Sequence, residues 1–426
     1  MNAAPTSQST LYQTFRHLSR DVRLYMLASA IVGFTIFGGI ETVILNLYLL
    51  RLGYGSRFIG WVNATGALTN TLIALPLGLL GLRVSRRRMM MTGMLTMATG
   101  MGALPFAEYL PGHLTRVWLL VTRGIGYLGM GVFQIGGTPF LIGATRPGER
   151  NQAYAFHTAI GPLAGLAGGL VGGLLPSFFA GLAGVGLSDT GPYRQTLWTT
   201  ALFLIPGFFL VRATTETHPA QQLRTERRNS SVPLIIFVLI FLSGFLQLAG
   251  ERVARTYFNV YMDMGFQTSP SFIGSFWSMG HCLSVATALL SPYLCKRWGI
   301  VNVSILGAFG MVTSLLLMTW LTHPYAVGLA FVSLIGFAAI RRPAYTVHHQ
   351  ELISPAWRPT MAGTTSFSAG SSEFTMALLG GYTIASVGFA PLFQTGALLT
   401  AVGAALFWLY FRTPRGERGE AVDGGQ

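Results

Sequence analysis

Charged residues are scarce in this chain of 426 residues, of which only 10% are Asp, Glu, Lys or Arg. Soluble domains carry about 25% charged residues, so a water-exposed surface for the whole chain is excluded. Cysteine is scarcer still: Cys282 and Cys295 lie in one apolar segment, which excludes a disulfide-stapled fold and predicts helix packing for both thiols. With 51% hydrophobic residues, the chain is predicted to be a membrane protein.

Acidic residues are half as numerous as basic ones: 14 Asp and Glu stand against 28 Lys and Arg, giving a formal net charge of +14. Such an excess can indicate nucleic-acid binding, because basic surfaces bind phosphate backbones. Here the basic residues fall between apolar segments, so no nucleic-acid partner is expected. The lipid bilayer, with its acidic inner-leaflet headgroups, is the expected partner of these residues.

Apolar segments long enough to cross about 30 Å of hydrocarbon as helices recur along the chain. They predict an all-α membrane protein with twelve transmembrane helices, because a membrane-spanning strand needs only ~10 residues. The predicted spans are 23–50, 58–80, 89–107, 115–142, 153–180, 194–212, 233–262, 271–294, 300–321, 325–346, 360–386 and 390–411.

Basic residues are distributed unevenly between alternate loops. If both termini are cytoplasmic, 19 of the 28 basic residues lie in cytoplasmic segments, four lie outside and five fall within spans. The positive-inside rule therefore predicts cytoplasmic termini and a multi-pass protein of the cell (inner) membrane. The first apolar run is too long for a secretory signal and is predicted to be retained as a span.

The longest polar interruption divides the spans into two sets of six. The predicted parts are a cytoplasmic N-terminal segment (1–22), an N-terminal six-helix bundle (23–212), a cytoplasmic linker (213–232), a C-terminal six-helix bundle (233–412) and a disordered tail (413–426). The sets match at near-constant spacing, since Asn46 corresponds to Asn259 and Arg83 to Arg297. This internal repeat predicts two pseudo-symmetric halves, as in many transporters.

A basic loop, GLLGLRVSRRR from Gly78 to Arg88, follows the second span. Together with the twelve spans and the duplication, it resembles the major facilitator superfamily, whose signature loop lies between the second and third spans. The resemblance covers nearly the whole chain and implies the two-bundle fold of that family. Two positions depart from the family pattern, because Leu82 stands where the family has Asp and Ser85 where it has Gly.

The resemblance also implies gating residues. The fifth-span sequence IGPLAGLAGG resembles the family's antiporter motif, and VTRGIGYLGMG resembles its proton-relay motif around Arg123. These are motifs of the twelve-span drug and metabolite efflux members. The implied gating residues are Gly78, Arg83, Arg86, Arg87, Arg88, Arg297, Gly161, Pro162 and Gly165. The cluster Arg86–Arg88 is expected to govern assembly and conformational cycling rather than ligand affinity.

Ionisable residues within spans are candidate functional residues, because each costs at least ~2.5 kcal/mol to insert. They are Glu41, Glu251, Glu373, Arg123, Arg252, Arg255, Arg341 and Arg342. Glu251 and Arg255 are four residues apart and are predicted to form an ion pair, whereas Arg252 points about 100° away and needs another partner. Arg341 and Arg342 lie near the inner end of their span, where reaching the membrane surface is as reasonable as binding a solute.

A central site is expected where the first, fourth, seventh and tenth spans meet. Glu41 is the first choice for the proton-coupling residue, Glu251 the second, and Arg123 is expected to modulate proton binding. The expected substrate-binding residues are Asn46, Tyr48, Tyr127, Gln134, Arg255, Asn259 and Glu373. The alternative is that the acids only neutralise arginines and hold the halves together. No cofactor, metal site or catalytic set is expected, and a monomer is expected.

The sequence favours a secondary active transporter working by alternating access, with proton-coupled efflux of amphipathic small molecules as the preferred activity. The excess of two arginines among the in-span charges leaves a second interpretation, an antiporter or importer of organic or phosphorylated anions. An intramembrane lipid enzyme or a non-transporting sensor is the alternative of another class. The enzyme is disfavoured because the sequence contains no nucleophile–base–acid set or metal-ligand cluster.

Overall fold

The computed structural model describes residues 18–80, 84–145, 149–215, 234–353 and 357–411, in which all regular structure is helical. In chain order the helices are α2 (Arg20–Thr35), α3 (Ile40–Arg51), α4 (Ser56–Leu80), α5 (Arg86–Ala103), η1 (Leu104–Tyr109), α6 (Gly112–Ala144), α7 (Arg150–Ala183), α8 (Gly191–Arg212), α9 (Leu234–Phe266), α10 (Pro270–Trp298), α11 (Ile300–Trp320), α12 (Pro324–Glu351), α13 (Arg358–Val387) and α14 (Phe389–Phe411). With α2 and α3 forming one span, they make the twelve spans expected from hydropathy. Eight of the spans are apolar and long enough to cross a membrane by composition and length alone.

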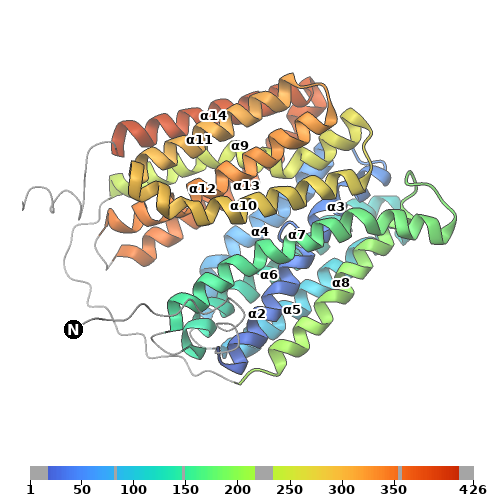
Figure 1. The fold of residues 1–426 in the computed structure, drawn as a ribbon. Coiled ribbons are helices and arrows are strands. Elements are labelled where there is room, and N and C mark those ends of the chain that lie inside the picture. The colour runs from blue at the N-terminus through green and yellow to red at the C-terminus, as the bar shows by residue number, and fades with distance from the viewer. Residues whose placement is uncertain (1–17, 81–83, 146–148, 216–233, 354–356, 412–426) are drawn as a thin grey trace, which may run out of the picture.

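The helices form two bundles, α2–α8 in blue to green and α9–α14 in yellow to red (Figure 1). The end where α2 begins and α14 ends, on the left in Figure 1, is termed the terminal end, and the opposite end is termed the far end. The bundles pack against each other mainly through α4 with α13 and α7 with α10, and α3 also contacts α9 and α10.

The outer faces of the bundles are apolar. On α7, the side chains of Leu174, Phe178 and Leu182 recur at four-residue spacing and are all exposed, which is the pattern of a lipid-facing helix surface. The largest buried core lies between the bundles, where Leu47 of α3 and Phe258 of α9 belong to one cluster. Burial of apolar side chains from both halves therefore holds the bundles together.

The first span is broken between α2 and α3, at Ile36–Gly39. Gly38 has a φ of +76°, a conformation that favours glycine because side chains are strained there. The Thr42 hydroxyl accepts a hydrogen bond from the Gly38 N–H at 3.1 Å and donates one to the Ile36 carbonyl, so these backbone groups have partners. The sequence predicts an unbroken span over 23–50, because hydropathy does not register a change of backbone direction.

The glycines of α7 allow two helices to approach its backbone. A Cβ added at Gly172 would lie 2.7 Å from the Cα of Ile40, and one at Gly173 would lie 2.8 Å from the carbonyl oxygen of Pro270 in α10. These distances are too short for a side chain. The glycine-rich face of α7 therefore seats the broken first span on one side and the opposite bundle on the other.

Candidate functional site

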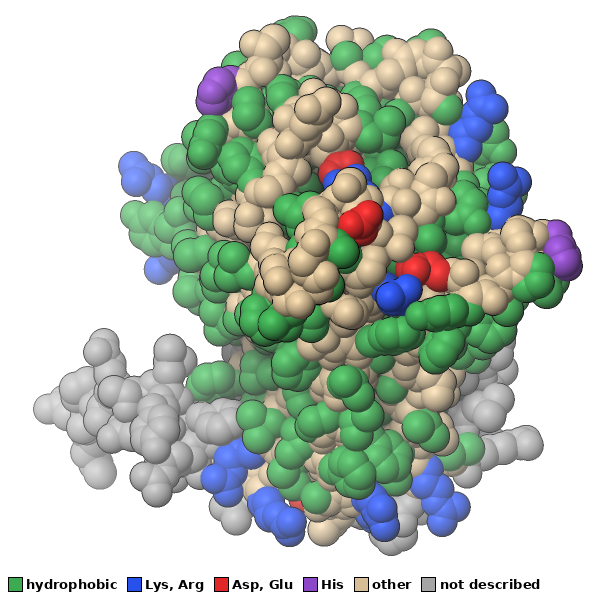
Figure 2. All heavy atoms as spheres, turned by 90° about the vertical axis from the view of Figure 1, so that its right-hand side faces the viewer, with side chains coloured by type: hydrophobic (Ala, Val, Ile, Leu, Met, Phe, Trp, Pro, Cys, Tyr) green, Lys and Arg blue, Asp and Glu red, His purple; other side chains and the backbone are tan. Residues whose placement is uncertain are grey.

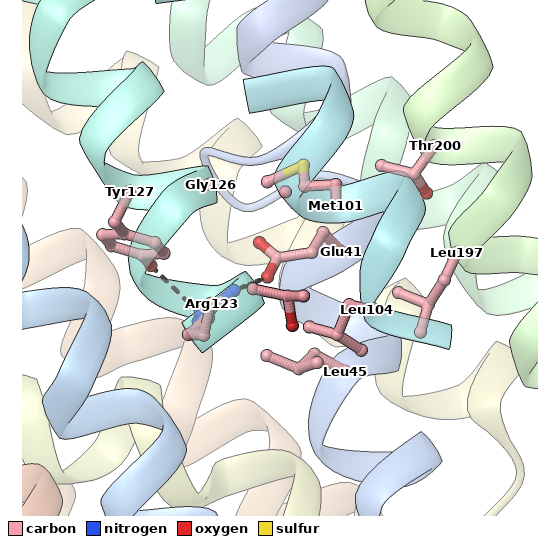
Figure 3. A pocket seen from close by; sticks show the side chains of 11 residues that line it. Glu41, Leu45, Met101, Leu104, Arg123, Gly126, Tyr127, Leu197 and Thr200 are labelled. Atoms are coloured by element: carbon pink, nitrogen blue, oxygen red, sulfur yellow. Dashed lines mark hydrogen bonds and ion pairs between the residues drawn. The ribbon is translucent and has the colours of Figure 1, made fainter. Parts of the chain in front are cut away.

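The first in-span charge pair is sealed within the N-terminal bundle. Glu41, in the first turn of α3, forms an ion pair with Arg123 of α6, and both side chains are buried. Arg123 also donates to the Tyr127 hydroxyl at 3.2 Å, one turn further along α6. Figure 3 shows these three side chains at a pocket that is otherwise lined mainly by apolar residues. The pair joins residues of one bundle only.

The second acid, Glu251 of α9, is shared by two arginines. Arg255 Nε lies 2.8 Å from Glu251 Oε1, so the predicted ion pair is confirmed. Arg342 Nη2 of α12 lies 3.1 Å from the same oxygen. The carboxyl side chain is only 2% exposed, whereas that of Arg342 is 66% exposed. One negative charge therefore faces two positive charges, and one of these is open to its surroundings.

The third acid, Glu373 of α13, is the partner that Arg252 requires. Arg252 Nη1 lies 2.9 Å from Glu373 Oε2, and the glutamate side chain is 35% exposed. Glu373 also interacts electrostatically with Arg123 and Tyr127 of the opposite bundle. Its carboxyl side chain is the most exposed of the three in-span acids.

Arg341 does not reach the membrane surface, which corrects that interpretation of its position. The residue is 3% exposed, and its Nη1 donates to Gln247 Oε1 of α9 at 3.0 Å. The partner of the Arg341 guanidinium is therefore the neutral side-chain amide of Gln247. With two acids and four arginines, the C-terminal bundle holds the whole excess of two in-span positive charges.

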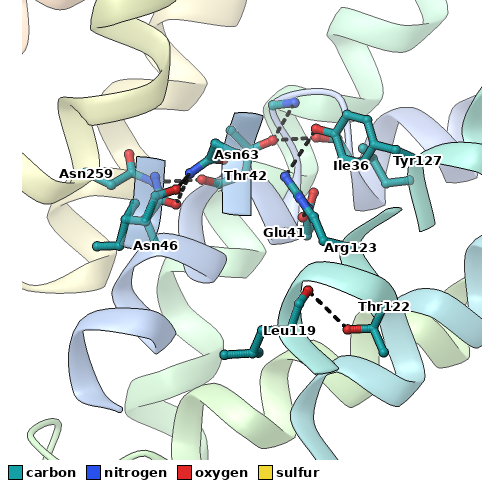
Figure 4. A network of polar contacts seen from close by, with 12 residues as sticks. Ile36, Glu41, Thr42, Asn46, Asn63, Leu119, Thr122, Arg123, Tyr127 and Asn259 are labelled. Carbon is teal, nitrogen blue, oxygen red and sulfur yellow. Dashed lines mark hydrogen bonds and ion pairs between the residues drawn. The ribbon is translucent and has the colours of Figure 1, made fainter. Parts of the chain in front are cut away.

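Two asparagines join α3 and α9 across the boundary, and their contacts are reciprocal. Figure 4 shows Asn259 beside Asn46 and Thr42. Asn46 Nδ2 donates to the Thr256 carbonyl at 2.7 Å, and Asn259 Nδ2 donates to the Val43 carbonyl at 2.9 Å. Asn259 Nδ2 also lies 2.7 Å from the Thr42 carbonyl. These amides, predicted to bind substrate, therefore make hydrogen bonds between the bundles.

The side-chain oxygens of the same asparagines accept hydrogen bonds from equivalent positions of the repeat. Asn63 Nδ2 of α4 donates to Asn46 Oδ1 at 2.9 Å, and Trp277 Nε1 of α10 donates to Asn259 Oδ1 at 2.6 Å. The two donors are thus supplied by the second span of each half. Each asparagine is fixed by its own bundle while it binds the other.

Further contacts close the far end. Arg51 and Asp263 form a two-bonded ion pair with N–O distances of 2.9 and 2.6 Å. Ser56 Oγ donates to the Gly381 carbonyl at 3.0 Å. Figure 2 faces this end and shows acidic and basic side chains beside one another near its middle, with hydrophobic side chains at its flanks. The bundles are therefore joined by polar contacts at the far end.

Two further candidate substrate residues lie apart from these clusters. Tyr48 is fully buried, and its hydroxyl donates to the Pro105 carbonyl at 3.4 Å inside the N-terminal bundle. Gln134 is exposed on α6, two turns from Tyr127. Among the described contacts, neither residue touches an arginine of the C-terminal bundle.

The predicted gating residues divide into three groups. Arg86 Nη1 donates to the Pro139 carbonyl at 2.8 Å, and Arg87 donates to the Arg212 carbonyl, so both hold ends of neighbouring helices. Arg88 and Arg297 are exposed. Gly78 lies near the end of α4, Gly161, Pro162 and Gly165 lie in α7, and Arg83 and Leu82 fall outside the described residues.

Sequence reasoning missed Asp263, Gln247 and Trp277. Asp263 lies near the end of the seventh span, where an acid needs no special explanation, and the other two carry no charge that would single them out in a span. Their only available signal was the repeat, which places Trp277 214 residues after Asn63. Among the described residues, no group of three or more His, Cys, Asp or Glu side chains could hold a metal ion.

Comparison with known proteins identifies the family. The family model of the Major Facilitator Superfamily matches residues 25–375. No protein with a curated description matches the sequence.

Solved transporters share the fold. A variant of the nucleoside transporter NupG superposes with a TM-score of 0.72 and 14% identity, over 92% of this chain and 100% of that one. The xylose transporter XylE from E. coli, in an inward-open conformation, superposes with a TM-score of 0.73 and 13% identity, over 95% of this chain and 98% of that one. A bacterial homologue of the human lysosomal transporter Spinster, inward-facing and occupied, superposes with a TM-score of 0.71 and 11% identity, over 92% of this chain and 96% of that one. The chain belongs to the major facilitator superfamily and is an all-helical secondary transporter of small molecules, not an enzyme.

Proposed function

We propose that this transporter binds a small organic anion at the boundary between its bundles and moves it by alternating access. The observation that carries the proposal is Arg342, which shares Glu251 with Arg255 while 66% of its own side chain is exposed. A guanidinium that is not fully neutralised can bind a carboxylate or phosphate through two parallel hydrogen bonds. An anion would also offset the positive excess of the C-terminal bundle.

Thermal unfolding of the purified protein tests this proposal. Sodium benzoate, citrate and inorganic phosphate are compared with choline chloride and glucose at matched ionic strength, because a bound ligand raises the melting temperature. We expect stabilisation by an organic anion, and at least about tenfold weaker apparent affinity in Arg342→Gln, since a hydrogen bond to a charged group is lost. Stabilisation by the cation or the neutral solute alone would contradict the proposal.

We also propose that both termini are cytoplasmic, which would make the closed far end the outer end of the protein. The support is the 19-to-4 distribution of basic residues between the two sets of loops. In a Cys282→Ser/Cys295→Ser background, an impermeant thiol reagent added to intact cells should label Ser188→Cys, at the far end, and spare Gly416→Cys. The opposite labelling pattern would reverse the orientation.

Proton-coupled efflux of amphipathic compounds is the second proposal. It is supported by the pocket that Glu41 lines together with Leu45, Met101 and Leu104. Proteoliposomes with an internal pH dye test it: an amphipathic solute added outside should move protons in exchange, and Glu41→Gln, although less stable, should remain folded and stop this movement. An unchanged proton flux in that variant would remove Glu41 from the proposal.

A further inference from the structure

Three phenylalanines of α9 and α13, termed the aromatic row, lie with their rings stacked: Phe241, Phe245 and Phe367. The ring centroids of Phe241 and Phe367 are 5.7 Å apart, and those of Phe241 and Phe245 are 6.3 Å apart. Two serines of α13 fix the register of the helices, because Ser368 donates to the Phe241 carbonyl and Ser372 to the Phe245 carbonyl, each at 2.8 Å. The three rings are therefore held in place by contacts between the two backbones.

The row faces the boundary between the bundles at Phe367. This residue precedes Gly370 by one helical turn, so the two share a face of α13. A Cβ added at Gly370 would meet the side chain of Thr71, in α4 of the opposite bundle. That face of α13 is therefore turned toward the opposite bundle. The Phe367 side chain is nevertheless 49% exposed, so its ring is open beside the boundary.

One end of the row meets the in-span charges. Arg252 follows Phe245 by two helical turns and lies on the same face of α9. The register of the helices places Glu373 beside the turn that follows Phe245, and Arg252 Nη1 reaches Glu373 Oε2 at 2.9 Å. The exposed cation, Arg342, is bound to Glu251, the residue before Arg252. An aromatic surface and the positive excess of the C-terminal bundle are therefore neighbours.

We propose that the aromatic row binds the ring of the transported solute, which makes aromatic carboxylates the substrate class of this transporter. The inference rests on the proposed anion transport, because Arg342 binds the carboxylate while the phenylalanines bind the ring. Aromatic rings attract one another through their quadrupoles in addition to the burial of apolar area. A flat aromatic ring therefore gains more from the row than a saturated ring of the same carbon skeleton.

Calorimetric titration of the purified protein with three probes tests ring and charge separately. Sodium 2-naphthoate is compared with sodium decahydro-2-naphthoate, which has the same charge but saturated rings, and with 2-naphthamide, which has the same rings but no charge. We expect naphthoate to bind at least about threefold more tightly than its saturated counterpart.

Each other outcome overturns a stated part. Equal or tighter binding of the saturated acid would overturn the recognition of the ring and leave the anion proposal standing. Binding of the amide as tight as that of naphthoate would overturn the anion proposal and leave the recognition of the ring. Failure of all three probes to bind would overturn both.

Variants of the row locate the preference for the aromatic acid. Phe367→Leu keeps an apolar side chain at an exposed position, so it should fold and bind both acids equally, whereas Phe367→Tyr should keep the preference of about threefold. Phe178→Leu is the matched control on the lipid-facing surface of α7 and should also keep it. A preference that survives in both Phe367→Leu and Phe241→Leu would place the ring elsewhere and overturn the proposal.

Discussion

The two bundles use their in-span charges differently. The N-terminal bundle encloses one acid with one arginine, Glu41 with Arg123, whereas the C-terminal bundle sets four arginines against two acids and leaves Arg342 exposed. In a buried pair of one acid and one arginine each charge compensates the other. Removing one member lowers the free energy of unfolding, because the remaining buried charge is left without compensation. An unbalanced, open set can accept a further anion. The contrast is therefore between a sealed pair and an open cluster.

The sealed pair gives the largest predicted effect on stability. Glu41→Gln should lower the free energy of unfolding by ~3–5 kcal/mol, because it leaves Arg123 buried and uncompensated. Denaturant unfolding in detergent measures this. The double variant Glu41→Gln/Arg123→Met should recover much of the loss, and a fully stable single variant would mean that the pair is not sealed.

Along α7, glycines in close contact with other helices can be compared with glycines that meet no other atom. Gly168→Ala should cost ~1–3 kcal/mol, because the added Cβ would meet the Phe34 carbonyl and lie 2.9 Å from the Cα of Gly39. Gly161→Ala is the matched control, since its Cβ would meet no atom within 4 Å. Melting temperatures of the two variants compare them directly. Equal losses would show that helix propensity, not contact with the broken span, decides the outcome.

The open cluster should lose less stability when its acid is removed. Glu251→Gln should cost only ~1–2 kcal/mol, because Arg342 and Arg255 are partly exposed and water can compensate their charges. The same change should strengthen binding of benzoate, since one competing negative charge is gone. Calorimetric titration measures the affinity. If Glu251→Gln lost as much stability as Glu41→Gln, the two bundles would not differ in how well their in-span charges are compensated.

The smallest effect concerns the basic loop at the terminal end. Arg86→Gln should cost about 1 kcal/mol, because its bond to the Pro139 carbonyl is lost, and should slow transport without changing solute affinity. Arg88→Gln, at an exposed position, is the matched control and should be within ~0.5 kcal/mol of the parent. A large loss of affinity in the first variant would place the loop in the binding site.

Much of the fold could be predicted because the hydropathy of each span depends only on its own residues. The Glu251–Arg255 pair could be predicted because both residues lie on one face of the same helix. That Arg252 needs another partner was also predictable. The partner itself, Glu373, lies 121 residues away in sequence, and only the packing of α13 on α9 brings it near. The break at Gly38 and the burial of Arg341 depend on contacts between helices, which a hydropathy pattern does not contain.

The reciprocal asparagines give the far end an isologous interface inside a single chain. Asn46 and Asn259 are 213 residues apart, and so are the residues whose carbonyls they bind, Val43 and Thr256. The internal repeat thus supplies one patch twice, and each copy binds the other as the two halves of a symmetric dimer interface do. A substitution of either asparagine therefore removes the hydrogen bonds of one copy between the bundles and leaves those of the other copy in place.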